Sequence, residues 1–133
     1  MGGIYSSNKQ NMIKNFRLYN IYWYDSNNNR ANWEEVFSNV IFNMTSEIKK
    51  IIDFFSNYNQ KKPWIVIISN SKGEKLISEL HNNKNIKAFC LYKMSSEILA
   101  SWTKKYEKIK GIAKNPEDLY NILLKLNREY IPN

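Results

Sequence analysis

The stretch WIVIISNSKGEKLISELH, residues 64–81, decides the fold. Its first five residues are wholly apolar, a short polar turn follows, and Leu76, Ile77 and Leu80 then line one side of a helical pattern. A strand without a polar member is typical of a central parallel strand that helices cover on both faces. The segment therefore predicts a buried strand over residues 64–68 that leads directly into a helix ending at His81.

Four further segments have the composition of strands, and each leads into a helical pattern. These strands are predicted at residues 17–24, 40–42, 86–92 and 109–112. The helices are indicated by capping residues and by apolar side chains at helical spacing: Asn32 with Glu35 for a helix through Trp33, Val36 and Phe37; Thr45 for a helix through Ile48, Ile51, Ile52 and Phe55; a helix through Ile98, Leu99, Trp102 and Tyr106; and Asn115 with Pro116 for a helix through Leu119, Ile122, Leu123, Leu126 and Tyr130.

This alternation predicts an α/β fold in which a five-stranded parallel sheet lies between two layers of helices, a three-layer α/β/α sandwich. The small fold that fits best is flavodoxin-like, with strand order 2-1-3-4-5 and a crevice at the carboxyl ends of the first and third strands. The chain of 133 residues is predicted to hold one domain, residues 17–133, preceded by an extended N-terminal arm, residues 1–16.

The composition gives more information about the compartment of the protein than about its function. The single cysteine, Cys90, lies in an apolar run and has no partner for an intramolecular disulfide. No segment approaches the roughly 20 apolar residues that cross a bilayer, and no secretory signal is recognisable. We therefore expect an intracellular protein, cytoplasmic or cytoskeletal, with a mitochondrial setting as an alternative because no acid precedes Asp25. The formal net charge of +8 favours an acidic partner.

Four segments carry a likeness to a known family. They are YWYDSNNN at 22–29, IVIISNSKGEKLISELH at 65–81, IKAFCLY at 86–92 and SWTKKYEKIKGI at 101–112. Through them, residues 17–126 resemble receiver domains of the response-regulator type, and more closely a degenerate, pseudo-receiver branch found in eukaryotic multidomain proteins.

The resemblance implies that phosphoryl-transfer chemistry has been lost. An active receiver has an acceptor aspartate after its third strand, two acids after the first, a hydroxyl after the fourth and a lysine after the fifth. Here Ser69 and Asn70 stand at the acceptor position, Asp25 is the single acid after the first strand, and Ser95 and Lys114 could occupy the other two positions. Such a set offers neither the nucleophile nor the cation site. We therefore expect no catalytic residue, no metal and no cofactor.

The polar turn before residue 74 is a candidate anion site. Ser69, Ser71, Lys72 and Gly73 precede a helix, whose free N–H groups and dipole attract negative charge. The turn lacks the glycine spacing of a phosphate loop, so an ordinary strand-to-helix turn is the favoured interpretation. His81 is the only histidine and is interpreted as the end of the helix rather than as a ligand or base.

A basic segment is the best candidate for a docking surface. It lies where the predicted fourth helix meets the fifth strand and comprises Lys104, Lys105, Tyr106, Lys108, Lys110 and Lys114. The resemblance implies a binding role here, because receivers commonly hold partners with the face formed by their fourth helix, fifth strand and fifth helix. A solvated run of charges is the alternative. The tryptophans fit packing positions and no RNA-binding signature surrounds them, so nucleic acid is a disfavoured partner.

The beginning of the chain fits a lipidation motif. The residues MGGIYS match the pattern for N-myristoylation at Gly2, with Ser6 at the favoured position. A single acyl chain binds membranes only marginally, so Lys9, Lys14 and Arg17 would supply the second, electrostatic signal. Short motifs of this kind also arise by chance.

Three functional hypotheses follow. The first is a non-catalytic protein-binding module, an accessory subunit of a larger intracellular assembly whose partner surface is acidic, such as a microtubule lattice or a membrane complex. The second is a flavodoxin-like enzyme or binding protein that holds a phosphorylated small molecule between Asp25 and the turn at residues 69–73. The third is a peripheral membrane protein anchored through Gly2.

Overall fold

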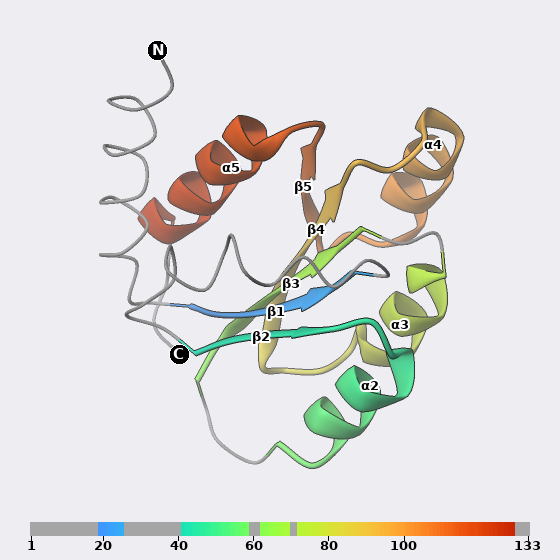
Figure 1. Cartoon of the computed structure of the whole chain (residues 1–133), viewed down its shortest axis with the longest axis vertical. Helices are drawn as coiled ribbons and strands as arrows, with labels where there is room; N and C mark the ends of the chain where they lie inside the picture. The colour runs from blue at the N-terminus through green and yellow to red at the C-terminus, as the bar shows by residue number, and fades with distance from the viewer. Residues whose placement is uncertain (1–18, 26–40, 59–61, 70–71, 130–133) are drawn as a thin grey trace.

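A computed structural model describes residues 19–25, 41–58, 62–69 and 72–129. These residues contain a five-stranded sheet with the order β2-β1-β3-β4-β5, in which every neighbouring pair is parallel (Figure 1). The strands are β1 (Asn20–Tyr24), β2 (Phe42–Thr45), β3 (Trp64–Ile68), β4 (Ile86–Tyr92) and β5 (Ile109–Ala113). The predicted order 2-1-3-4-5 is confirmed.

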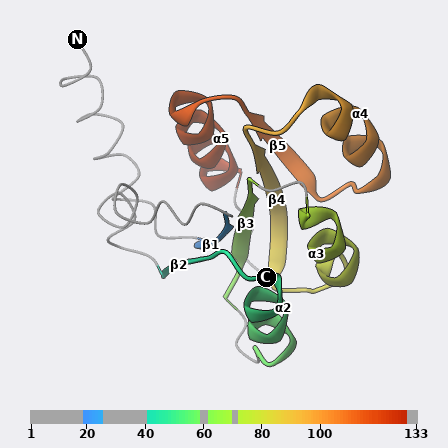
Figure 2. The same ribbon diagram turned by 45° about the vertical axis from the view of Figure 1, so that its right-hand side comes forward.

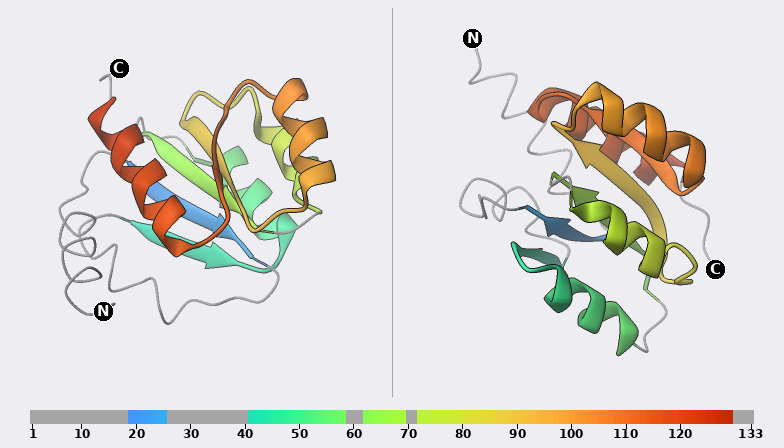
Figure 3. Two further views of the ribbon diagram at one scale, coloured as in Figure 1. Left: turned by 90° about the horizontal axis from the view of Figure 1, so that it is seen from above. Right: turned by 90° about the vertical axis from the view of Figure 1, so that its right-hand side faces the viewer.

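Four described helices cover the two faces of this sheet. They are α2 (Ile48–Ser56), α3 (Gly73–Leu80), α4 (Ser96–Lys105) and α5 (Pro116–Arg128). Figure 3 shows α5 on one face and α2, α3 and α4 on the other, and Figure 2 shows the strands between these layers. The predicted three-layer α/β/α sandwich is therefore confirmed. The arm over residues 1–16, Gly2 and the short helix expected after Asn32 lie outside the described residues.

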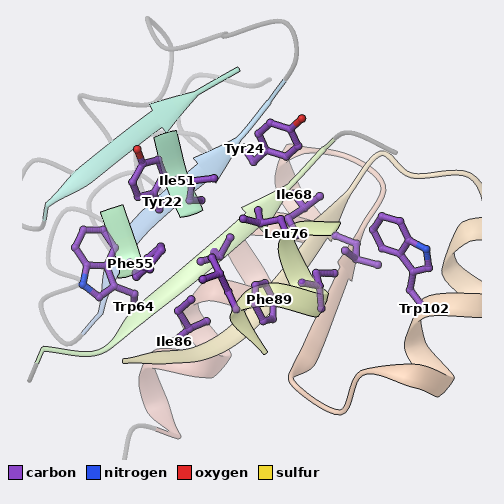
Figure 4. Close-up of a cluster of buried hydrophobic side chains, with 14 residues drawn as sticks. Tyr22, Tyr24, Ile51, Phe55, Trp64, Ile68, Leu76, Ile86, Phe89 and Trp102 are labelled. Atoms are coloured by element: carbon purple, nitrogen blue, oxygen red, sulfur yellow. The ribbon is translucent and has the colours of Figure 1, made fainter. Parts of the chain in front are cut away.

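The apolar run of β3 faces two separate cores. Ile65 and Ile67 pack on the α5 side with Trp23, Cys90 and Leu123. The alternate residues Trp64, Val66 and Ile68 pack on the other side with a cluster that includes Phe55, Leu76, Phe89 and Trp102 (Figure 4). Successive side chains of a strand point to opposite faces, so a central strand buried on both sides has no position for a polar residue. This explains why the sequence alone predicted the range of β3.

The edge strand β2 differs from the prediction at residues 40–42. It begins at Phe42 and continues to Thr45, because its register follows β1 from Ile21 opposite Phe42 to Tyr24 opposite Thr45. Thr45, which was expected to cap the next helix, is therefore the last residue of the strand. Its Oγ1 accepts a hydrogen bond from the backbone N–H of Glu47 at 3.1 Å, and Glu47 is the N-cap of α2.

The caps of the later helices match the sequence more closely. The side chain of Asn115 accepts a hydrogen bond from the backbone N–H of Asp118 at 2.9 Å, with Pro116 as the first residue of α5. His81 is the C-cap of α3, as predicted. Tyr106, expected inside the helical stripe, has an extended backbone at the C-cap of α4. The last predicted residue of the final stripe, Tyr130, lies outside the described residues.

Candidate functional site

Ser69, which the resemblance predicts at the acceptor position, follows β3 at the edge of the sheet where the carboxyl ends of β1 and β3 lie side by side. Its hydroxyl accepts a hydrogen bond from Trp23 Nε1 at 3.0 Å and donates to the carbonyl of Tyr24 at 3.3 Å. Its backbone N–H donates to the same carbonyl at 3.0 Å. The hydroxyl thus satisfies a partly buried indole N–H and joins the two strands.

His81, the only histidine of the chain, lies far from this hydroxyl. The helix α3 runs back from the carboxyl edge of the sheet, beginning at Gly73 and ending at His81, so the imidazole lies at the amino edge. Its ring faces Tyr106, with ring centroids 5.7 Å apart. A serine nucleophile needs a base within hydrogen-bond reach. His81 cannot serve Ser69 in this role.

Asp25 follows β1 at the same edge and is 5 % exposed. Its backbone N–H donates to the carbonyl of Thr45 at 3.0 Å, which extends the pairing of β1 with β2. Burial raises the pKa of Tyr92, and the negative charge of Asp25 raises this pKa further. Within the described ranges, no three His, Cys, Asp or Glu side chains lie close enough together to hold a metal ion.

Lys93, which follows β4, was not singled out from the sequence. Its backbone is left-handed, with φ of 55°, and it is the one non-glycine residue of the described chain with positive φ. Its N–H donates to the carbonyl of Ala113 at 2.9 Å, and its Nζ lies 5.3 Å from the centre of the Tyr92 ring. The segment after β4 contains no glycine or asparagine to signal such a turn, so the residue types alone did not predict this conformation.

The candidate anion turn is tightly packed where it is described. Gly73 is buried, and a Cβ atom built on it would lie 2.4 Å from Cγ2 of Ile68. The glycine is therefore needed for the close approach of α3 to β3. Lys72 is exposed at the N-cap of α3, Ser69 is used as described above, and Ser71 lies outside the described residues.

Three of the six residues of the basic segment contact other parts of the protein. Lys105 Nζ lies 3.0 Å from Glu74 Oε2, and the hydroxyl of Tyr106 donates to the same oxygen at 3.2 Å. The hydrogen bond from Lys105 lowers the pKa of Glu74. Lys108 is half-buried and its Nζ donates to the carbonyl of Asn83 at 2.8 Å. These three residues join the connection between α4 and β5 to α3 and the turn after it.

The remaining lysines of the segment are exposed but do not form one cluster. Lys104 lies in the last turn of α4, Lys110 lies within β5, and Lys114 follows the carboxyl end of β5. The backbone N–H of Lys114 donates to the carboxylate of Asp118 at 3.0 Å, while the residue itself is exposed. The free positive charge of the segment is thus distributed along β5 and the end of α4.

A groove with a volume of about 310 Å³ lies beside β5, and sequence reasoning missed it. It is lined by Lys110, Gly111, Ile112, Ile122, Lys125, Leu126 and Glu129. Ile112 is 41 % exposed and is one of two large apolar side chains that the described residues expose, the other being Ile41. The sequence IKGIA gave no clear signal of the groove, because β5 pairs irregularly with β4 between Phe89 and Cys90 and simple alternation does not hold across such an irregularity.

No family model, curated protein or solved structure matches this chain. The resemblance to receiver domains stays a prediction. Across the parts of the chain that are described, no helix combines the length and the apolar character needed to cross a bilayer.

Proposed function

We propose that this protein is a non-catalytic protein-binding module, an accessory subunit of a larger intracellular assembly with an acidic partner surface, for example a microtubule lattice or a membrane complex. The observation that carries the proposal is the position of Ser69. At the place of the receiver's acceptor carboxylate, its hydroxyl is bonded to Trp23 and Tyr24. A group that stabilises the strands in this way is poorly suited to accept a phosphoryl group.

Positive charge supports the binding part of the proposal. The formal net charge is +8, and the exposed lysines at 104, 110 and 114 lie along the end of α4 and along β5. Surface charge of one sign steers a partner of the opposite sign toward a surface and disfavours partners of like sign. The partner surface is therefore proposed to be acidic.

The first experiment compares two variants with the same change in net charge. The test variant is Lys104→Glu, Lys110→Glu and Lys114→Glu. The control variant is Lys49→Glu, Lys62→Glu and Lys75→Glu, three exposed lysines that lie in α2, just before β3 and in α3. Each tagged protein is purified from the native cell at physiological salt, and partners are quantified by mass spectrometry. We expect a stoichiometric acidic partner with the wild type and the control, and its loss with the test variant. Equal recovery with both variants would refute the assigned surface.

A second experiment addresses the alternative of a ligand-binding or catalytic protein. The wild-type chain is heated with nucleotides, flavins and phosphodonors while its unfolding is followed, and its mass is measured after acetyl phosphate and magnesium. We expect no change in melting temperature and no added phosphoryl group. A reproducible increase in melting temperature with one ligand class would instead favour a flavodoxin-like binding protein.

A further inference from the structure

The outer edge of β5 is an open sheet edge among the described residues. β5 is the last strand in the order and pairs there with β4 alone. The carbonyl of Ala113 accepts a hydrogen bond from Lys93 N–H at 2.9 Å, so the backbone groups of Ala113 point toward β4. Along a strand, successive backbone groups alternate in direction, and the N–H and C=O of Ile112 therefore point away from the sheet. The N–H of Lys114 already donates to Asp118, so the open part of the edge is centred on Ile112. Unpaired edge groups of this kind are a template for another strand.

The groove described above lies beside this edge. On the face of the sheet that α5 covers, Ile122 and Leu126 line it. A Cβ at Gly111 would lie 2.4 Å from Cγ2 of Ile122, so α5 packs closely over the strand while leaving its edge open. On the other face, Ile112 is 41 % exposed. A strand placed beside β5 would have its side chains alternately against these two apolar surfaces.

The charges around the groove select the kind of strand that fits. Lys110 and Lys125 line it together with a single acid, Glu129. A second copy of the chain would bring its own Lys110 to the same edge and a net charge of +8, and lysines on an edge strand are a common device against self-pairing. An acidic strand meets no such repulsion.

We propose that an extended acidic segment of a partner protein adds to the sheet as a further strand beside β5. Its centre is apolar, to cover Ile112 on one face and Ile122 and Leu126 on the other, and its flanks are acidic, to pair with Lys110 and Lys125. Main-chain hydrogen bonds supply part of the affinity and the side-chain pattern supplies the specificity. The inference rests on the proposed function and names the partner chemistry and the binding mode.

The test is a titration of the isotope-labelled full chain with a capped peptide of sequence Asp-Glu-Val-Ile-Val-Glu-Asp, followed by NMR. We expect the amide signals of residues 110–112 to shift and the Ile112 amide to exchange more slowly with solvent in the complex. A peptide with the same composition but with its acidic residues at the centre is the matched ligand control. It is expected to bind at least about tenfold more weakly, because it places charge against the apolar walls.

Two substitutions locate the site on the protein. Ile112→Asp places a negative charge at an exposed position of the edge, and we expect it to lower the peptide affinity at least about tenfold. Lys110→Glu is expected to lower the affinity about fivefold, whereas Lys104→Glu, the same charge change on α4, leaves it within about twofold. The circular dichroism of each variant is compared with that of the wild type, to show that the fold is retained.

Each other outcome overturns strand addition in a distinct way. Shifts confined to α4, with Lys104→Glu as the damaging change, would mean side-chain docking elsewhere on the basic segment. A dimer of the chain alone that Ile112→Asp dissociates would assign the edge to a second copy. Absence of peptide binding at millimolar concentration overturns strand addition at the edge of β5. If the triple lysine variant nevertheless loses the cellular partner, the proposed function stands, but with a different binding mode.

Discussion

Replacing Gly73, the first residue of α3, with alanine tests whether this glycine is needed for the packing of α3 on β3. The added Cβ would lie 2.4 Å from Cγ2 of Ile68, which is fully buried in the central strand. Overpacking of this kind costs about 1–3 kcal/mol. Alanine also removes about 0.5–1 kcal/mol of the backbone entropy that glycine loses on folding. Taken at the middle of each range, these two effects give an expected net loss of about 1 kcal/mol of unfolding free energy.

The measurement is urea unfolding followed by tryptophan fluorescence, together with a thermal melt. For a domain of this size the loss corresponds to a fall in melting temperature of about 4 °C per kcal/mol. Ile68→Ala removes the methyl group that the new Cβ would meet, at a cost of about 2–5 kcal/mol by itself. In that background, Gly73→Ala is expected to be neutral or to stabilise by up to about 1 kcal/mol. A Gly73→Ala protein as stable as the wild type, or an equal loss in both backgrounds, would refute the packing argument.

Four smaller predictions concern other residues of the described chain. Ser69→Ala removes the hydroxyl that accepts from the Trp23 indole N–H and is expected to cost about 1–3 kcal/mol in urea unfolding, and Trp23→Phe, which also loses buried packing, is expected to cost less in the Ser69→Ala background than in the wild type. Burial raises the pKa of Cys90 to about 12, so we expect no reaction with iodoacetamide at pH 8 in the folded protein and complete reaction in denaturant, by intact mass. The folded-state pKa of Glu74 is lowered, so its contribution to stability is complete above the unfolded pKa of about 4.3 and is lost as pH falls through the folded value; Glu74→Gln should flatten this part of the stability curve between pH 2.5 and 6. Lys93→Gly relieves a left-handed backbone and is expected to stabilise by up to about 1 kcal/mol in a thermal melt, whereas destabilisation would show that contacts of the lysine side chain outweigh the strain.

Local patterns predicted the parts of the fold whose boundaries local physics sets. The strands β3 and β4 match the predicted residues 64–68 and 86–92, because each apolar run ends where the chain leaves the core. The start of α5 was equally clear, since the capping Asn115 and the fixed φ of Pro116 act within one turn. The predicted boundaries of β2 were wrong. This short edge strand takes its register from β1, more than twenty residues earlier in the chain, and a local sequence pattern does not show that pairing.

The candidate site was less predictable for the same reason. Lys105 and Lys110 are indistinguishable in sequence, yet the first is paired with Glu74 on another helix while the second lines an open groove. The composition of a basic run shows how much charge it carries but not which of its charges tertiary contacts already use. The apolar side chain that marks the open edge, Ile112, was hidden in the sequence because an isolated isoleucine in a strand ordinarily indicates a core position.

Ser69 and the open edge of β5 are separated by β4 in the order of the sheet. Ser69 joins β1 to β3 through neutral hydrogen bonds to Trp23 and Tyr24. From Ser69 to the edge, the described connection runs through β4, where the N–H of Lys93 donates to the carbonyl of Ala113. A switch requires an element with two arrangements and a ligand that prefers one of them. Because Ser69 is held by these strands, we expect the proposed binding at β5 to be constitutive, with an affinity set by salt and by the acidity of the partner strand.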